Sequence, residues 1–128
     1  EILEVFPVEV KNRQHLGQTY TESLVHLDAL KTPNIGEHNT SVYAQYTILA
    51  KQREEIQQSL KEIAIPSVSY YSVPLHLQPV FGNLRHKAGD FSVAEKVANQ
   101  CLSLPMSPYL THGNQRKVID AICKIEKF

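Results

Sequence analysis

Residues 65–81, with the sequence IPSVSYYSVPLHLQPVF, hold the side chains best suited to binding a ligand. Tyr70 and Tyr71 carry hydroxyl groups on flat rings, and His76 carries an imidazole. A tyrosine can stack on a planar ligand or donate a hydrogen bond to a phosphate oxygen, and an imidazole can donate such a bond too. Three prolines restrict the backbone here, and rigid loops of this kind commonly bind ligands. Alternatively, the two tyrosines alternate across a strand, one facing the core and the other facing solvent.

Other kinds of chemistry lack their characteristic patterns in this sequence. There is no glycine-rich phosphate loop of the GxGxxG or Walker type, and no GxSxG segment that would hold a nucleophilic serine. No two of the six histidines have the i, i+4 spacing of a helical zinc site, and neither cysteine has a Cys or His nearby. We therefore expect no metal site in this chain.

Charge and composition indicate an ordinary globular domain. Lys plus Arg and Asp plus Glu each total 13, so the formal net charge is zero, and a nucleic acid is not an expected partner. No apolar run has membrane length, and no signal-peptide pattern is present, so we expect a cytoplasmic protein that contacts no membrane. Cys101 and Cys123 are expected to be buried thiols rather than a disulfide. The chain opens at Glu1 without an initiator methionine, which suggests a longer parent chain.

Hydrophobic periodicity predicts the elements that would position the proline-rich loop. Apolar residues at helical spacing predict helices at 1–27, 51–63, 91–102 and 113–126. Residues of high β propensity predict strands at 42–50, 65–72 and 103–106. Pro7 predicts a break or kink near Phe6, and residues 31–41 predict a turn-rich connector. The fold class is therefore α+β, a small sheet of about three strands packed with helices, with the strand direction open.

Four segments resemble the DegT/DnrJ/StrS family of pyridoxal-phosphate (PLP) dependent nucleotide-sugar aminotransferases. Residues 74–79, PLHLQP, resemble the loop motif of that family. The other three segments are HNTSVYAQYT at 38–47, GDFSVAE at 89–95 and LSLPMSPYL at 102–110. All four occur in the family's order and with similar spacing. The likeness extends from about Phe6 to Ile125 and is greatest to enzymes that aminate a UDP-linked 3-keto uronic acid.

The resemblance implies that residues 1–128 form a single C-terminal small domain, entered through a connecting helix at 1–27. In the family, a large N-terminal domain holds PLP and the lysine of its Schiff base, and glutamate donates the amino group. None of the nine lysines here lies in a segment that resembles the cofactor-lysine loop, so we expect no catalytic and no cofactor-binding residue in this chain. The implied parent is a homodimeric enzyme that makes amino sugars for bacterial surface polysaccharide, including lipopolysaccharide O-antigen.

The resemblance also implies a role for individual residues. The small domain of the family closes over the active site and contacts the nucleotide-sugar, so Tyr70, Tyr71 and His76 are the expected substrate-binding residues. Tyr71 matches the family's His-Tyr pair, whereas Tyr70 replaces the histidine and Ser72 replaces the proline that usually follows. Ala64 replaces a helix-ending glycine, a change that costs little unless the position requires a positive φ.

Two other functions remain open at this point. The chain could be a stand-alone module that captures nucleotide-sugars or regulates a partner without catalysis. It could also be a dimerisation or scaffold piece, because without a large domain the apolar residues Ile2, Leu3 and Val5 would be exposed and would favour self-association. As an aminotransferase fragment, the chain is expected to fold but to bind PLP only weakly.

Overall fold

The computed structural model describes residues 2–125, with side chains from Leu3 onward, and confirms the α+β class. Its α-helices are α1 (Ile2–Leu24), α2 (Arg53–Glu62), α3 (Ser92–Gln100) and α4 (His112–Ile125). Its strands are β1 (Leu30–Lys31), β2 (Tyr46–Ala50) and β3 (Cys101–Leu104), and two short 3₁₀ helices are η1 (Leu75–Leu77) and η2 (Pro79–Leu84). None of the helices among the described residues is long and apolar enough to cross a membrane.

The three strands form one antiparallel sheet in the order β1-β2-β3. Leu30 lies opposite Ala50 between β1 and β2, and Ile48 lies opposite Leu102 between β2 and β3. This arrangement settles the strand direction that the sequence left open and excludes a parallel strand-helix-strand unit from the sheet. Cys101 and Cys123 are free thiols, the first buried and the second partly buried.

The hydrophobic core lies between one face of the sheet and three helices. Burial alternates along β2, so that Tyr46, Ile48 and Ala50 are fully buried. The helices that cover this face contribute Tyr20 and Leu24 from α1, Ile56 and Leu60 from α2, and Val118 and Ile122 from α4. Burying a large apolar side chain stabilises a fold by about 1.5–3 kcal/mol, so these contacts supply much of the stability. Ile63, which follows α2 and continues its apolar spacing, is exposed instead.

Two buried tyrosines connect α1 to the sheet. The ring centroids of Tyr20 and Tyr46 lie 5.0 Å apart. The Tyr20 hydroxyl donates to the carbonyl of Pro105 at 3.0 Å, and the Tyr46 hydroxyl lies 2.8 Å from Thr21 Oγ1. Burial raises the pKa of Tyr20 well above its ordinary value and raises the pKa of Tyr46 to about 12. Both hydroxyls are therefore neutral at physiological pH, and their polar groups are satisfied.

The predicted strand at 42–50 begins only at Tyr46, so its first four residues were predicted wrongly. Tyr43 has a φ of 45°, in the left-handed region that a strand does not use. Its ring packs on Gly17 of α1 and lies 5.7 Å from the Tyr46 ring, centroid to centroid. The close approach to a helical glycine, rather than β propensity, determines this backbone conformation.

Proline chemistry accounts for other differences from the predicted elements. The segment 65–72 is not a strand. Only Val68 pairs with Ser103 in an isolated bridge, and Pro66 has no N–H to extend the ladder. Pro105 likewise ends β3 at Leu104, so the strand lies two residues earlier than predicted. Pro7, by contrast, does not break α1, which continues from Ile2 to Leu24 with Pro7 at an exposed position inside it.

The remaining differences are shifts of helix ends and a missed strand. The first helix ends at Leu24 rather than at residue 27, and the two-residue strand β1 that follows was not predicted. The other helices match their predicted ranges to within two residues, except that residue 126 lies outside the described part of the chain. Leu3 and Val5 are exposed as expected, and the side chain of Ile2 is outside the described residues.

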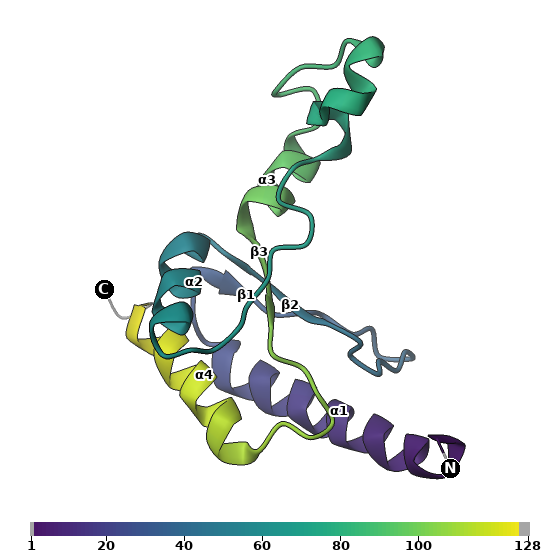
Figure 1. The fold of residues 1–128 in the computed structure, drawn as a ribbon, viewed down its shortest axis with the longest axis vertical. Coiled ribbons are helices and arrows are strands. Elements are labelled where there is room, and N and C mark those ends of the chain that lie inside the picture. Colours follow the sequence, from purple (N-terminus) through teal and green to yellow (C-terminus); the bar gives the residue numbers. More distant parts are fainter. Residues whose placement is uncertain (1, 126–128) are drawn as a thin grey trace.

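Residues 73–97 form an arm that extends away from the core (Figure 1). The arm contains η1, η2 and most of α3, and none of its residues is buried as a whole, although the side chain of His76 is largely shielded. α3 leads back to the body, where Ala98 is buried and β3 begins at Cys101. The molecule thus consists of a packed body and an arm with no core of its own.

Helix α2 ends in a Schellman motif in which Ala64 takes the left-handed position. The Ile65 N–H donates to the Leu60 carbonyl at 2.9 Å, and the Ala64 N–H donates to the Lys61 carbonyl at 3.0 Å. Ala64 has a φ of 57°, a region that costs a residue with a Cβ about 1 kcal/mol. The position therefore does require a positive φ, and alanine is strained there.

Replacing Ala64 by glycine should stabilise the protein. Ala64→Gly removes the Cβ strain but increases the entropy of the unfolded chain, so we expect the free energy of unfolding to rise by about 0.5–1 kcal/mol. Urea denaturation measures the change. Gln58→Gly, in the exposed interior of α2, is the control and should lower stability by about 1 kcal/mol. A decrease for Ala64→Gly would contradict the strain at this position.

Replacing Gly17 by alanine should destabilise the protein through Tyr43. A Cβ at position 17 would lie 2.5 Å from ring carbons of Tyr43, and overpacking of this kind costs about 1–3 kcal/mol. In a Tyr43→Ala background the same change should be neutral or stabilising by up to about 1 kcal/mol, because alanine favours helix more than glycine does. Thermal unfolding of the wild type, the two single variants and the double variant gives a double-mutant cycle. If the stability changes of the two single variants simply add up to that of the double variant, the proposed clash is ruled out.

Candidate functional site

Tyr70 and Tyr71 lie in the turn between the Val68 bridge and the arm, and both are exposed. Tyr70 is 56% exposed and Tyr71 is 78% exposed. The alternative in which one of them packs in the core therefore does not describe this structure. Two neighbouring rings are available for contact with another molecule.

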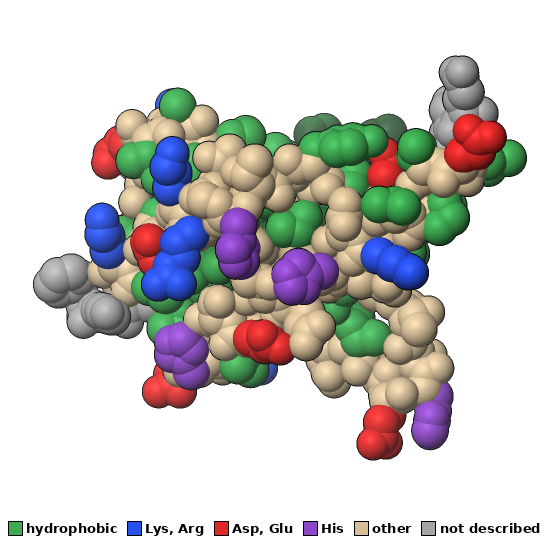
Figure 2. All heavy atoms as spheres, turned by 90° about the horizontal axis from the view of Figure 1, so that it is seen from below, with side chains coloured by type: hydrophobic (Ala, Val, Ile, Leu, Met, Phe, Trp, Pro, Cys, Tyr) green, Lys and Arg blue, Asp and Glu red, His purple; other side chains and the backbone are tan. Residues whose placement is uncertain are grey.

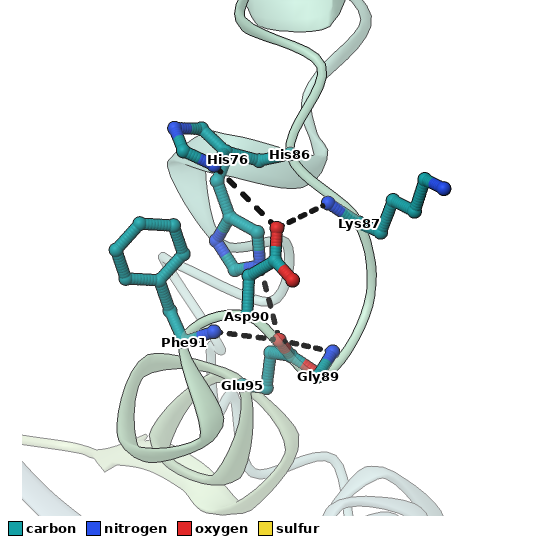
Figure 3. Close-up of polar contacts among 7 residues, drawn as sticks. All are labelled: His76, His86, Lys87, Gly89, Asp90, Phe91 and Glu95. Carbon is teal, nitrogen blue, oxygen red and sulfur yellow. Dashed lines mark hydrogen bonds and ion pairs between the residues drawn. The ribbon is translucent and has the colours of Figure 1, made fainter.

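His76 lies inside the arm and has its own protein partners. Its side chain is only 8% exposed. Its Nε2 atom lies 3.1 Å from Glu95 Oε1, and its ring centroid lies 4.7 Å from that of Phe91 (Figure 3). The imidazole therefore joins η1 to the start of α3.

The structure does not bring the three predicted residues into one hollow. His76 lines an apolar hollow of about 430 Å³ in the arm, together with Phe81 and Phe91. Tyr70 lines a separate hollow of about 190 Å³ beside Pro105 and Met106. A ligand that contacts all three side chains would have to extend along the surface from the body to the arm.

Glu95 is the centre of the polar contacts in the arm (Figure 3). Its carboxylate accepts hydrogen bonds from the Gly89 N–H at 2.8 and 3.0 Å, from the Phe91 N–H at 3.3 Å and from the imidazole of His76. These donors hold the pKa of Glu95 below its ordinary value, and the Gly89 N–H has the largest effect. The carboxylate also lies in the first turn of α3, where the helix dipole favours a negative charge.

Glu95 ends the family-like segment 89–95, but the sequence pattern predicts no role for it. The available signal was a glutamate near the start of a predicted helix, a position from which a carboxylate can accept from the backbone N–H groups that precede the helix. Its contact with His76, 19 residues earlier, could not be read from local spacing.

A second imidazole, that of His86, also packs against the Phe91 ring. His86 Nδ1 lies 3.5 Å from Asp90 Oδ2, which also accepts from the Lys87 N–H at 2.9 Å. The ring centroids of His86 and Phe91 lie 4.9 Å apart, edge to face. This pair is 40% and 45% exposed, so it is far more open to solvent than His76.

Arg53 supports the segment that leads to the tyrosines, a role that sequence analysis also missed. Its Nη1 atom donates to Ser69 Oγ at 3.2 Å, and Ser69 Oγ lies 3.4 Å from Cys101 Sγ. Its Nη2 atom pairs with Glu54 at 3.0 Å. The residue before Tyr70 is thereby fixed to both α2 and β3.

The described residues include no solvent-shielded lysine and no cluster of metal-ligating side chains. PLP chemistry in an aminotransferase requires a lysine amine that the protein shields from solvent, and the eight lysines that the structure describes are all exposed. Across residues 2–125 no group of three or more His, Cys, Asp or Glu side chains could hold a metal ion. The described lysines therefore do not fit the Schiff-base position of PLP. Basic and acidic side chains are interspersed over the face in Figure 2.

Comparison with known proteins identifies the family. The profile of the DegT/DnrJ/EryC1/StrS aminotransferase family matches residues 2–123. The chain belongs to this family. The matched range includes the exposed tyrosines Tyr70 and Tyr71 and the whole arm, so both are part of the family's shared sequence pattern.

Relatives and solved structures agree with this assignment. The chain is 42% identical over 116 residues to a Geobacillus stearothermophilus protein named pleiotropic regulatory protein, covering 89% of this chain and 31% of that relative. It is 41% identical over 120 residues to the Pseudomonas aeruginosa UDP-2-acetamido-2-deoxy-3-oxo-D-glucuronate aminotransferase, covering 94% of this chain and 32% of the relative. The crystal structure of S. venezuelae DesV in complex with a ketimine intermediate superimposes with a TM-score of 0.91 at 27% identity, covering 98% of this chain and 34% of DesV.

The chain spans about a third of the length of these family members. The fold of this chain is therefore shared with sugar aminotransferases, while about two thirds of each relative has no counterpart in the 128 residues.

Lowering the pH should weaken the arm through Glu95. Because its folded-state pKa lies below the ordinary value of 4.5, the stability it contributes is present above that value and is lost as the pH falls through the folded pKa. In an NMR titration, the Gly89 amide should report a midpoint below this ordinary value. The melting temperature of Glu95→Gln should fall short of wild type at pH 7, and the gap should narrow at pH 3.

Glu55→Gln is the matched control for this titration. Glu55 is an exposed carboxylate on α2, so its removal should leave the Gly89 midpoint unchanged. A Gly89 amide that does not titrate with Glu95, or that titrates above the ordinary glutamate value of 4.5, would contradict the contacts described for this carboxylate.

Proposed function

We propose that this chain is the C-terminal small domain of a PLP-dependent aminotransferase that acts on a keto nucleotide-sugar. The observation that carries the proposal is the match of nearly the whole chain, in sequence and in fold, to sugar aminotransferases. In this proposal glutamate donates the amino group, and the remainder of the enzyme binds PLP and provides the Schiff-base lysine. PLP, when bound there, would accept the amino group from the donor and pass it to the sugar.

The contribution of this chain would be substrate contact and enclosure of the active site. Tyr70 and Tyr71 are exposed next to each other on a segment that Arg53 holds in place, which supports a role in stacking on or donating to a bound nucleotide. His76 is the third proposed contact, from the arm. The exposed apolar start of α1, with Leu3, Val5 and Val8, supports a connecting helix that is covered by the rest of the enzyme.

The proposed substrate is a UDP-linked 3-keto uronic acid. The support is the 41% identity to the Pseudomonas aeruginosa enzyme whose name specifies such a substrate. The product would be an amino sugar for bacterial surface polysaccharide, including lipopolysaccharide, made in the cytoplasm by a homodimer. Tyr70 would bind the diphosphate as a neutral donor, because a phenol cannot provide the positive charge of a protonated histidine.

A second candidate is a regulatory module that binds a nucleotide-sugar without catalysis. The observation that favours it is the 42% identity to a protein named pleiotropic regulatory protein. In that case the exposed tyrosines would recognise an effector, and a longer protein containing this chain would bind UDP-sugars but would not transaminate them.

Replacing Tyr71 should weaken substrate binding selectively. In the full-length enzyme that we propose carries this domain, Tyr71→Ala should raise the KM for the UDP-sugar about tenfold and leave the KM for glutamate nearly unchanged, because base stacking on an aromatic side chain is worth about 1–3 kcal/mol. Steady-state kinetics with each substrate varied in turn measures both constants.

Tyr109→Ala is the matched control for this experiment. Tyr109 is 73% exposed, close to the 78% of Tyr71, but it lies on the loop that follows β3 and contacts Glu9 of α1. Its replacement should change neither KM. Equal effects of Tyr71→Ala on both substrates would show that Tyr71 is not a nucleotide-sugar contact. Tight UDP-sugar binding without turnover would favour the regulatory candidate.

A further inference from the structure

The contact between Glu95 and His76 determines where the imidazole carries its proton. Both oxygens of the Glu95 carboxylate accept from the Gly89 N–H, and Oε1 also accepts from the Phe91 N–H. An ionised carboxylate has no proton to donate. Nε2 of His76, at 3.1 Å from Oε1, must therefore be the donor and must carry a hydrogen.

The other ring nitrogen of His76 is then available for a ligand. In Figure 3 it points away from Glu95. The described residues offer Nδ1 no hydrogen bond, and it is not among the fully buried polar atoms that lack a partner. In the neutral ring with Nε2 protonated, Nδ1 holds a lone pair and accepts a hydrogen bond. The hollow of about 430 Å³ that His76 lines gives such a donor room to approach.

We propose that Glu95 is a positioning residue that fixes the Nε2-protonated form of His76 and presents Nδ1 as an acceptor for a hydroxyl group of the nucleotide-sugar. The ligand in this statement rests on the proposed function, whereas the protonation of His76 does not. A sugar hydroxyl is the matching donor, because a phosphate oxygen has no hydrogen to offer to a lone pair at neutral pH.

The neighbouring pair of His86 and Asp90 shows what a less constrained arrangement looks like. Its contact is longer, at 3.5 Å, and both side chains are much more exposed. His76, by contrast, is packed against Phe91 and is almost fully buried, so its ring has one orientation. A hydrogen bond from one ring nitrogen to a fixed carboxylate commonly determines which tautomer the imidazole adopts.

The first experiment reads the His76 ring directly. In the 128-residue chain labelled with ¹⁵N-histidine, ring NMR at pH 8 should show His76 with a protonated Nε2 and an unprotonated Nδ1, and the Nε2–H proton should exchange slowly enough to be observed. Glu95→Ala should abolish the observable ring proton, and Asp90→Asn should leave it unchanged. A proton on Nδ1 in the wild-type chain would overturn the proposal, even if Glu95→Ala fails to fold.

The second experiment separates a positioning role from a structural one. In the full-length enzyme, Glu95→Gln and His76→Gln should each raise the KM for the nucleotide-sugar about threefold to tenfold, the worth of one ordinary hydrogen bond, without changing the KM for glutamate. His76→Gln keeps a donor near Glu95 but removes the Nδ1 acceptor. His76→Asn keeps a polar atom near the Nδ1 position, so its KM for the nucleotide-sugar should rise less than that of His76→Gln.

The outcomes of the two experiments are distinguishable. An Nε2-protonated His76 with unchanged KM values in all variants would make Glu95 a purely structural residue and overturn its positioning role. A wild-type enzyme that binds no nucleotide-sugar would remove the proposed function and the ligand with it, whereas the ring NMR would still decide whether Glu95 fixes the proton on His76.

Discussion

The contact between Tyr20 and Tyr46 is the interaction on which the body of this domain depends. It joins α1 to the central strand, and each hydroxyl extends the contact, one to the backbone after β3 and the other to Thr21. Two large aromatic side chains are thus buried with their polar ends satisfied, which is the condition under which tyrosine stabilises a core. The helices α2 and α4 complete the same cluster on this face of the sheet.

The arm is held together by a different kind of force. Its apolar side chains, including Leu75, Val80 and Val93, are largely exposed, so burial contributes little to its stability. The carboxylate of Glu95 instead collects donors from the loop before α3 and from η1. A carboxylate in the first turn of a helix is well suited to this task, because charge-assisted hydrogen bonds are stronger than neutral ones.

Sequence patterns predicted the parts of the fold that depend on periodic burial, and they missed the parts that depend on contacts between distant residues. The helical stripes of α2 and α4 were recognisable because residues three or four apart in the sequence share a face, and β2 was recognisable from the β propensity of its residues. The left-handed Tyr43 was not, since it responds to Gly17 of α1. Of the candidate site, the loop with Tyr70 and Tyr71 was found from residue types. Glu95 and Arg53 were missed because their partners lie on other elements.

Among the described residues, every side-chain hydrogen bond made by residues 73–97 has both ends within that range. A substitution in the arm therefore removes no partner from these described side-chain hydrogen bonds of the body, and a substitution in the body removes no partner from the hydrogen bonds around Glu95. The two parts can accumulate substitutions, insertions and deletions at different rates during evolution. A lineage could alter the reach or shape of the arm while inheriting the three-stranded body intact, which is a simple route to new ligand preferences on an old fold.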